Sequence, residues 1–166
     1  MNYYLILSFI IILCSLGMSG FSQSYQSHGF QVDYSGQMEK VQDNFDVEGN
    51  HFTVFQDVQK GINQNETDIY RLDIIKFQET VTDTDTYFNS LYDIYSETGD
   101  AKHTTFKGRK AVMADEKFQL EGKDIKQRRV TVFFDNTSYT LFYLGTPNEL
   151  YESKYNDFVD DFKFIR

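Results

Sequence analysis

The chain has 166 residues, a net charge of −9 from 25 acidic and 16 basic side chains, and a single cysteine. An acidic surface repels phosphate backbones and anionic membranes, so no nucleic-acid partner is expected. The length suits one domain that is large enough to bury a core.

The N-terminal segment has the pattern of an export signal. Leu5 to Leu16 is an uncharged run of twelve apolar and small residues. A membrane span needs about 20 apolar residues, whereas a signal peptide core is shorter. Cleavage after Ser22 would leave small residues, Gly20 and Ser22, at the two positions that the peptidase reads. The sequence therefore predicts a signal peptide over residues 1–22 and one domain over residues 23–166, which is periplasmic or secreted.

Two alternatives for this segment stay open. Residues 1–4 carry no Lys or Arg, so the run could be a buried apolar helix, although it lacks any polar face. Cys14 raises the possibility of an acylated lipoprotein, but Leu13 stands where such signals carry a small residue, which disfavours anchoring. Cleavage would remove the only thiol, so we expect a mature domain without disulfides or a membrane span, stabilised by packing of Tyr and Phe.

Alternating apolar and polar residues predict the strands of the domain. They are expected at residues 29–34, 51–58, 68–77, 110–120, 126–134 and 139–144. The last three form a meander, in which Gly122 can supply a turn residue with positive φ. The strand at 139–144 is apolar on both faces, which predicts a central position covered on both sides.

A helix is predicted over residues 84–98, where the apolar period changes. One face is formed by Phe88, Leu91, Tyr92 and Tyr95, at spacings of three, four and seven. Capping oxygens for its first turn are available from residues 82–85. Gly99 stands where a left-handed C-terminal residue is wanted.

A second helix is predicted at the C-terminus. Thr146 is the expected N-cap, Pro147 the first helical residue and Glu149 the capping-box partner. Its apolar stripe is expected to consist of Tyr151, Tyr155, Phe158 and Phe162. With strands in hairpin order, these elements predict an α+β fold, an antiparallel sheet of about six strands with helices packed on it.

Few residue patterns point to chemistry. His28, His51 and His103 are far apart in sequence, which disfavours a zinc site. Asp83 and Asp85 resemble the start of a calcium loop, but Phe88 stands where that loop requires glycine. The chain contains no G-x-S-x-G elbow and no phosphate-binding loop. The sequence therefore predicts no catalytic residue, no metal and no cofactor.

Basic residues around one predicted hairpin are the candidate binding site. They are Lys107, Arg109, Lys110, Lys123, Lys126 and Arg128. Pairing of residues 110–120 with 126–134 would keep Lys123 and Lys126 near the hairpin tip and point Arg128 and Arg129 to opposite faces. Such a patch could receive an acidic partner or an anionic ligand. The competing interpretation is edge protection and solubility.

The order of elements resembles the PsbP-like family, which includes many exported bacterial proteins. The resemblance is carried by Gly29-Phe30, Gly108-Arg109-Lys110-Ala111, Tyr139-Thr140-Leu141, Tyr155-Asn156-Asp157-Phe158 and Phe162-Lys163-Phe164. It implies an antiparallel sheet between helices, an α/β/α sandwich. It implies no catalytic residues, because members of the family act by docking to partners.

Three hypotheses for function follow. The first is an exported, non-catalytic protein that binds or helps assemble another envelope component, such as an envelope protein. The second is a carrier of a small or apolar ligand, which the many Tyr and Phe residues suggest and which needs a cavity of about 300 Å³ or more. The third is a hydrolase, which would need a histidine placed beside an aspartate and a serine.

Overall fold

The computed structural model describes residues 25–33, 36–45, 50–60 and 67–165. The predicted signal peptide, its cleavage site and Cys14 lie outside the described residues. None of the helices in the described ranges combines the length and the apolar character needed to cross a membrane.

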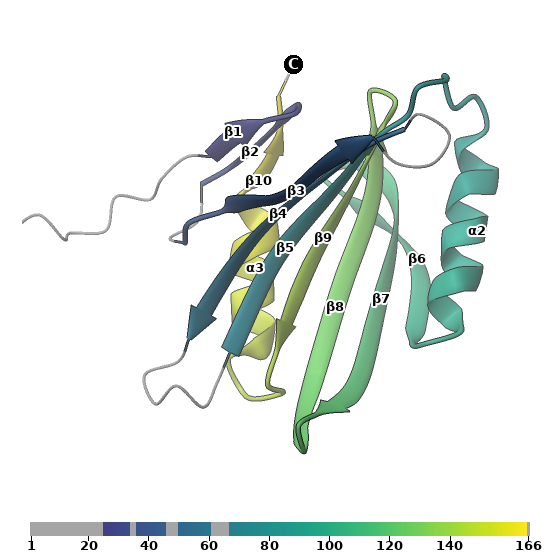
Figure 1. Ribbon diagram of the computed structural model, residues 1–166. Helices are drawn as coiled ribbons and strands as arrows, with labels where there is room; N and C mark the ends of the chain where they lie inside the picture. The colour runs from purple at the N-terminus through teal and green to yellow at the C-terminus, as the bar shows by residue number, and fades with distance from the viewer. Residues whose placement is uncertain (1–24, 34–35, 46–49, 61–66, 166) are drawn as a thin grey trace, which may run out of the picture.

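Seven antiparallel strands form a large sheet in the order β3-β4-β5-β9-β8-β7-β6 (Figure 1). They are β3 (Glu39–Phe45), β4 (His51–Lys60), β5 (Thr67–Lys76), β6 (Asp100–Phe106), β7 (Arg109–Leu120), β8 (Lys123–Phe134) and β9 (Thr137–Gly145). β9 is the central strand, and seven of its nine residues are buried. This confirms the central position that its apolar character on both faces predicts.

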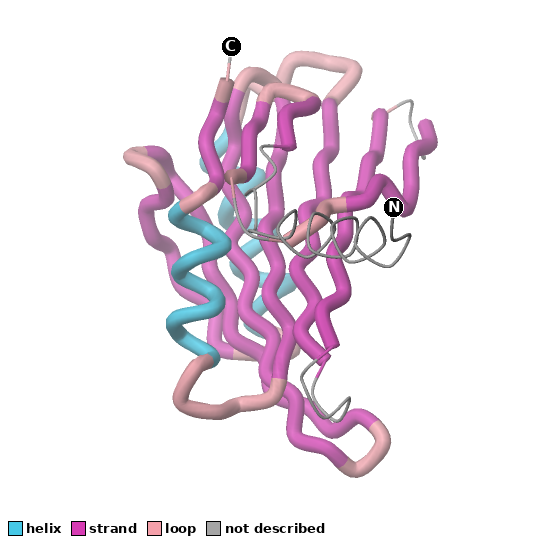
Figure 2. Tube along the Cα trace, turned by 90° about the vertical axis from the view of Figure 1, so that its left-hand side faces the viewer, coloured by secondary structure: helices cyan, strands magenta, loops and turns pink. Residues whose placement is uncertain are grey.

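A second sheet and two helices complete the described chain. Three short strands form the small sheet in the order β1-β2-β10: β1 (Tyr25–Ser27), β2 (Phe30–Val32) and β10 (Phe162–Phe164). The helices are α2 (Thr84–Ser96) and α3 (Tyr151–Asp160). In the turned view of Figure 2, the strands lie between the two helices, with α3 toward the viewer.

Tight turns join the long strands. Lys107-Gly108, Glu121-Gly122 and Asp135-Asn136 all have positive φ. Two consecutive residues with positive φ are typical of type I′ hairpin turns, which match the twist of the strands that they connect. The predicted turn at Gly122, with φ of 77°, is confirmed.

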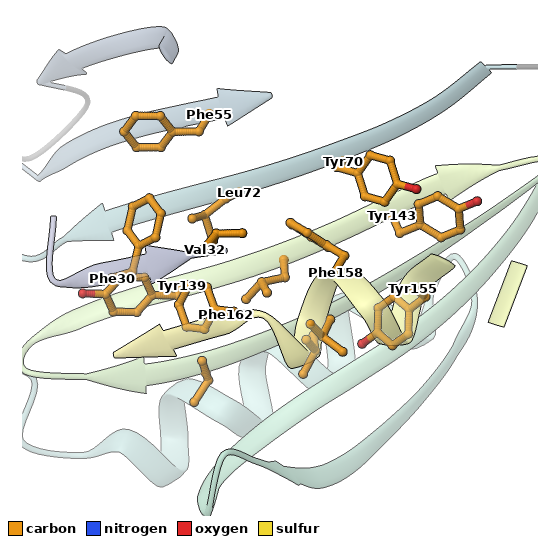
Figure 3. Packing of buried hydrophobic residues seen from close by; sticks show 14 of the residues in the cluster. Phe30, Val32, Phe55, Tyr70, Leu72, Tyr139, Tyr143, Tyr155, Phe158 and Phe162 are labelled. Carbon is orange, nitrogen blue, oxygen red and sulfur yellow. The ribbon is translucent and has the colours of Figure 1, made fainter. Parts of the chain in front are cut away.

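The main core lies between the large sheet, α3 and the small sheet (Figure 3). From the large sheet come Phe55, Tyr70, Leu72, Tyr139, Leu141 and Tyr143, and from α3 come Tyr151, Tyr155 and Phe158. Phe30 of β2 stacks on Phe162 of β10 with ring centroids 5.8 Å apart. Nine of the 18 buried residues of this core are Phe or Tyr, as the composition predicts.

A smaller core lies on the opposite face, under α2. Phe88 and Tyr95 of α2 pack against Val112 and Ala114 of β7. In β7, these two residues alternate with Ala111, which belongs to the main core. The two helices therefore cover opposite faces of one sheet, and α2 lies at its β6–β7 side (Figure 1).

The sheets contain more strands than the sequence predicts. The prediction of about six strands missed β1, β3, β6 and β10, and the large sheet alone has seven. β3 and β6 are its edge strands, and most of the β6 side chains are exposed. Edge strands with polar side chains on both faces lack the alternation by which a strand is found in a sequence.

Two predicted helix ends are also corrected. α3 begins at Tyr151, so Thr146, Pro147 and Glu149 precede the helix and do not cap it. Leu150 is the N-cap of α3, and its side chain makes no capping hydrogen bond. Asn148 holds the turn before the helix, because its Oδ1 accepts a hydrogen bond of 2.9 Å from the Leu150 N–H and its carbonyl accepts one of 3.1 Å from the Tyr151 N–H. Phe162 lies in β10, beyond the helix.

Gly99 does not have the left-handed conformation that its position after α2 predicts, because its φ is not positive. Close packing explains why this position requires glycine, because a Cβ here would lie 2.3 Å from the carbonyl oxygen of Asp115. The N-terminal prediction for α2 is confirmed, since the Asp83 carboxylate accepts a hydrogen bond of 3.0 Å from the Thr86 N–H.

Candidate functional site

The six predicted basic residues do not form one patch. Lys107 and Arg109 lie at the β6–β7 turn, whereas Lys123 begins β8 at the other end of β7. A strand of 12 residues separates these two ends by about 35 Å. Lys126 and Arg128 are brought together on the face that α3 covers.

Acidic side chains of the same chain lie close to Lys107, Lys110, Lys126 and Arg128. Lys107 lies 3.8 Å from Asp160, and Lys110 lies 2.5 Å from Asp85 of α2. Arg109 stacks its guanidinium 4.2 Å from the centre of the Phe134 ring. The role of the six residues in partner binding stays a prediction.

Lys126 and Arg128 fasten α3 to the sheet. Arg128 donates two hydrogen bonds of 2.5 Å to Asp115 of β7 and another to Glu152 of α3. Lys126 lies 2.9 Å from Glu152 and 3.6 Å from Asp115. The guanidinium of Arg128 also lies over the ring of Tyr155. The cluster of Asp115, Lys126, Arg128 and Glu152 therefore has a structural role, which is to attach α3 to the sheet.

The opposite face of β8 leads to a different site. As the hairpin predicts, Arg129 points away from Arg128, toward α2. It lines a groove of about 340 Å³ beside the C-terminal end of α2, which we call the two-arginine groove. Its lining residues are Gln56, Ile69, Arg71, Gln127, Arg129, Phe142 and Leu144.

Strand register explains why these residues meet. Gln56, Arg71, Phe142 and Arg129 are successive partners across β4, β5, β9 and β8. They form one row across the sheet, so the two arginines lie on either side of Phe142, about 10 Å apart at their Cα atoms. The guanidinium of Arg71 lies 5.4 Å from the centre of the Phe142 ring.

Each arginine of the groove is held by an acid. Arg71 donates from Nε and Nη2 to Asp73, at 2.6 and 2.8 Å. Arg129 donates from Nη2 to Glu116 and, at 3.4 Å, to Thr98, while its guanidinium lies 3.8 Å from the centre of the Tyr95 ring. A guanidinium that donates two hydrogen bonds is fixed in orientation, and its remaining N–H groups therefore have a fixed direction.

Burial shapes the electrostatics of the groove. It raises the pKa of Asp73 above the ordinary 3.8, although the hydrogen bonds and charge of Arg71 oppose this shift. It also lowers the pKa of Arg129. Arg129 Nε is the one buried side-chain nitrogen or oxygen of the described residues that has no hydrogen-bond partner. A buried donor without a partner is uncommon and asks for an explanation.

A second cleft, of about 510 Å³, lies between α2 and the β6–β7 edge. It is lined by Asp85, Phe88, Asn89, His103, Thr104, Lys110 and Ala111. Both clefts exceed the 300 Å³ that a carrier of a small ligand needs. In this cleft, however, the Lys110 ammonium is already engaged with Asp85.

The histidines do not gather in one place. His28 and His51 stack with ring centroids 6.1 Å apart, and both lie near β4. His103 is on β6 at the other side of the sheet, where it stacks on Tyr92. Among the described residues, no group of three or more His, Cys, Asp or Glu side chains is arranged to hold a metal ion.

Comparisons with known proteins give no family for the chain. No family profile matches it, and a search of curated proteins finds no match. Among solved structures, PA94 of Pseudomonas aeruginosa, a protein of unknown function, is 14% identical with a TM-score of 0.42, and the match covers 80% of this chain and 88% of that one.

A second solved structure is LpqN of Mycobacterium tuberculosis, a protein involved in cell envelope biogenesis. It is 10% identical with a TM-score of 0.42, and the match covers 78% of this chain and 92% of LpqN. Neither likeness is close enough to assign a family or a function. The resemblance to the PsbP-like family therefore stays a prediction.

Proposed function

We propose that this protein is an exported, non-catalytic binding module that holds another envelope component in the two-arginine groove. The observation that supports it is the groove itself, in which two fixed guanidinium groups flank an aromatic ring on a sheet face. A few polar groups on an apolar floor are typical of binding sites. The export signal predicted over residues 1–22 supports the envelope as the proposed place of action.

The groove opens beside exposed apolar surface. Val58 is 46% exposed and lies in register with Ile69, one of the lining residues. An apolar rim beside polar anchors is a frequent feature of surfaces that bind a partner.

Photo-crosslinking in living cells tests the proposal. A photoreactive amino acid replaces Val58, beside the groove, in one full-length chain. In a matched chain it replaces Ile94, which is 57% exposed on α2. We expect a discrete adduct from position 58 that position 94 does not give. The adduct should disappear when Leu144→Asp is added, because a partly buried carboxylate in place of leucine disrupts the apolar floor. Equal adducts from both positions, or none from position 58, would contradict the proposal.

A second candidate function is a carrier of a small ligand. It is supported by the volumes of the two clefts, about 340 and 510 Å³, which lie within the range of ligand pockets.

A further inference from the structure

Both arginines of the groove retain hydrogen-bonding capacity. Arg71 uses Nε and Nη2 for Asp73, and Arg129 uses Nη2 for Glu116 and Thr98. Within the described part of the chain, the Nη1 group of neither arginine donates a hydrogen bond. Two cationic groups with donors left over, lining one groove, suit an anionic acceptor.

An apolar row lies directly beside the arginine row. Val58, Ile69 and Leu144 are successive partners across β4, β5 and β9, two residues further along the strands. They lie on the same face as the arginines, since residues two apart share a face. A ligand that lies across this face would therefore meet positive donors on one side and aliphatic carbon on the other.

The charges of the groove favour a ligand with a single negative charge. Asp73 and Glu116 balance the two arginines, so a dianion such as a phosphate monoester would be repelled by two fixed carboxylates. The whole molecule carries −9, which disfavours a strongly acidic protein more than a small monoanion.

Size favours a small molecule as well. The groove measures about 340 Å³, near the lower end for ligand pockets. A stable protein interface needs about 800 Å² from each partner, far more than the seven lining residues offer.

We propose that the two-arginine groove binds a small amphiphilic monocarboxylate of the fatty-acid class. The carboxylate accepts hydrogen bonds from Arg71 and Arg129 near the ring of Phe142, and the alkyl chain lies along Ile69 and Leu144. Asp73 and Glu116 are positioning residues, which hold the two guanidinium planes. This inference rests on the proposed function, because it takes the same groove as the binding site.

Competition for a fluorescent fatty acid measures this binding. The chain, purified after expression from its full-length sequence, is titrated with dansyl-undecanoic acid below its micelle concentration. Dodecanoate, dodecanol and methyl dodecanoate are then compared as competitors. We expect dodecanoate to displace the probe at a concentration about tenfold lower than either uncharged analogue, because only the acid gains the charge-assisted hydrogen bonds. Equal displacement by all three would overturn the proposal.

Variants with opposite expected effects separate the site from general damage to the fold. Arg71→Gln should weaken dodecanoate binding about tenfold and leave dodecanol binding unchanged. Asp73→Asn keeps one acceptor oxygen that can hold the Arg71 guanidinium but removes the carboxylate charge that competes with the ligand, so it should tighten dodecanoate binding about threefold. Lys117→Gln is the matched control. It removes one positive charge from the exposed part of β7, on the opposite face of the sheet, and should change nothing.

The outcomes separate this inference from the proposed function. If the probe does not bind, or if Arg71→Gln binds dodecanoate as tightly as the unchanged chain, the inference is wrong. The position-58 adduct would then still support a partner in the groove. If neither the probe nor the adduct is found, both proposals fail.

Discussion

The ion pairs of Arg128 and of Lys110 differ mainly in how far their side chains are buried. The Arg128 side chain is 15% exposed and shares Asp115 and Glu152 with Lys126. The Lys110 side chain is 68% exposed, and the side chain of its partner Asp85 is 67% exposed. Exposed pairs contribute little to stability, whereas breaking a buried pair leaves a charge without compensation.

Arg128→Met should therefore lower the free energy of unfolding by about 3 kcal/mol, because Asp115 would stay partly buried without its bidentate partner. Methionine keeps much of the packing against Tyr155, so the lost free energy of unfolding would come mainly from the missing charge. Lys110→Met should cost less than about 1 kcal/mol. Urea unfolding of both variants gives the comparison, and similar losses for the two would show that burial is not the deciding factor.

At the scale of single elements, the turn that precedes α3 is held by Asn148. Its side chain accepts from Leu150, and its backbone carbonyl accepts from Tyr151. Threonine followed by proline at 146–147 forms a stronger sequence signal for a helix start, yet these residues precede the turn. Local side-chain hydrogen bonds of asparagine often compete with a helix in this way.

Asn148→Ala should destabilise the protein by about 1 kcal/mol, the usual net contribution of one intramolecular hydrogen bond, here the bond that closes the turn before α3. Thr146→Ala should change stability by less than about 0.5 kcal/mol, since Thr146 lies outside the helix. Thermal unfolding followed by circular dichroism distinguishes the two. A larger loss for Thr146→Ala would restore the sequence-based assignment of the cap.

Amphipathic elements could be predicted from the sequence because burial of one face makes apolar residues recur at regular spacing. The strands β4, β5, β7 and β8 and both helices are examples, whereas β9 was predicted from apolar residues on both of its faces. The edge strands β3 and β6 could not be predicted, because polar residues on both sides leave no such period.

The groove could not be predicted for a related reason. Its two arginines are 58 positions apart in sequence, and only the register of β5, β9 and β8 places them around Phe142. The alternation of Arg128 and Arg129 did predict that they point to opposite faces of the sheet. The second guanidinium, Arg71, carries no signal of its own in the sequence.

At the scale of the whole molecule, acid should loosen the attachment of α3. Burial raises the pKa of Asp115, but hydrogen bonds and charge from Arg128, with the charges of Lys126 and Lys102, bring it below the ordinary 3.8. The hydrogen bond from Lys126, with those from Arg128, outweighs burial and lowers the pKa of Glu152 below 4.5. A lowered carboxyl pKa contributes stability above its unfolded value and loses it as the pH falls through the folded value.

Stability should therefore fall as the pH drops below the ordinary carboxyl values of 3.8 and 4.5 and through the lowered ones. The unchanged chain should lose more than Arg128→Met, whose cluster is already broken, so the gap between their urea midpoints should narrow over this range. Asp73 acts in the opposite sense, because its raised pKa means that its charged form costs stability at neutral pH. A constant gap from pH 5 to pH 2 would contradict the role given to Asp115 and Glu152.

The small sheet has a consequence for how the protein is made. β2 pairs with β10 so that Phe30 lies opposite Phe164. Phe162 of β10 is fully buried in the main core. Contacts between residues so far apart in sequence are slow to form, because the loop that joins them must close first. The core cannot be completed before residue 164 has left the ribosome. The small sheet thus delays completion of the fold until its last strand has been made, which is compatible with the export proposed for this protein.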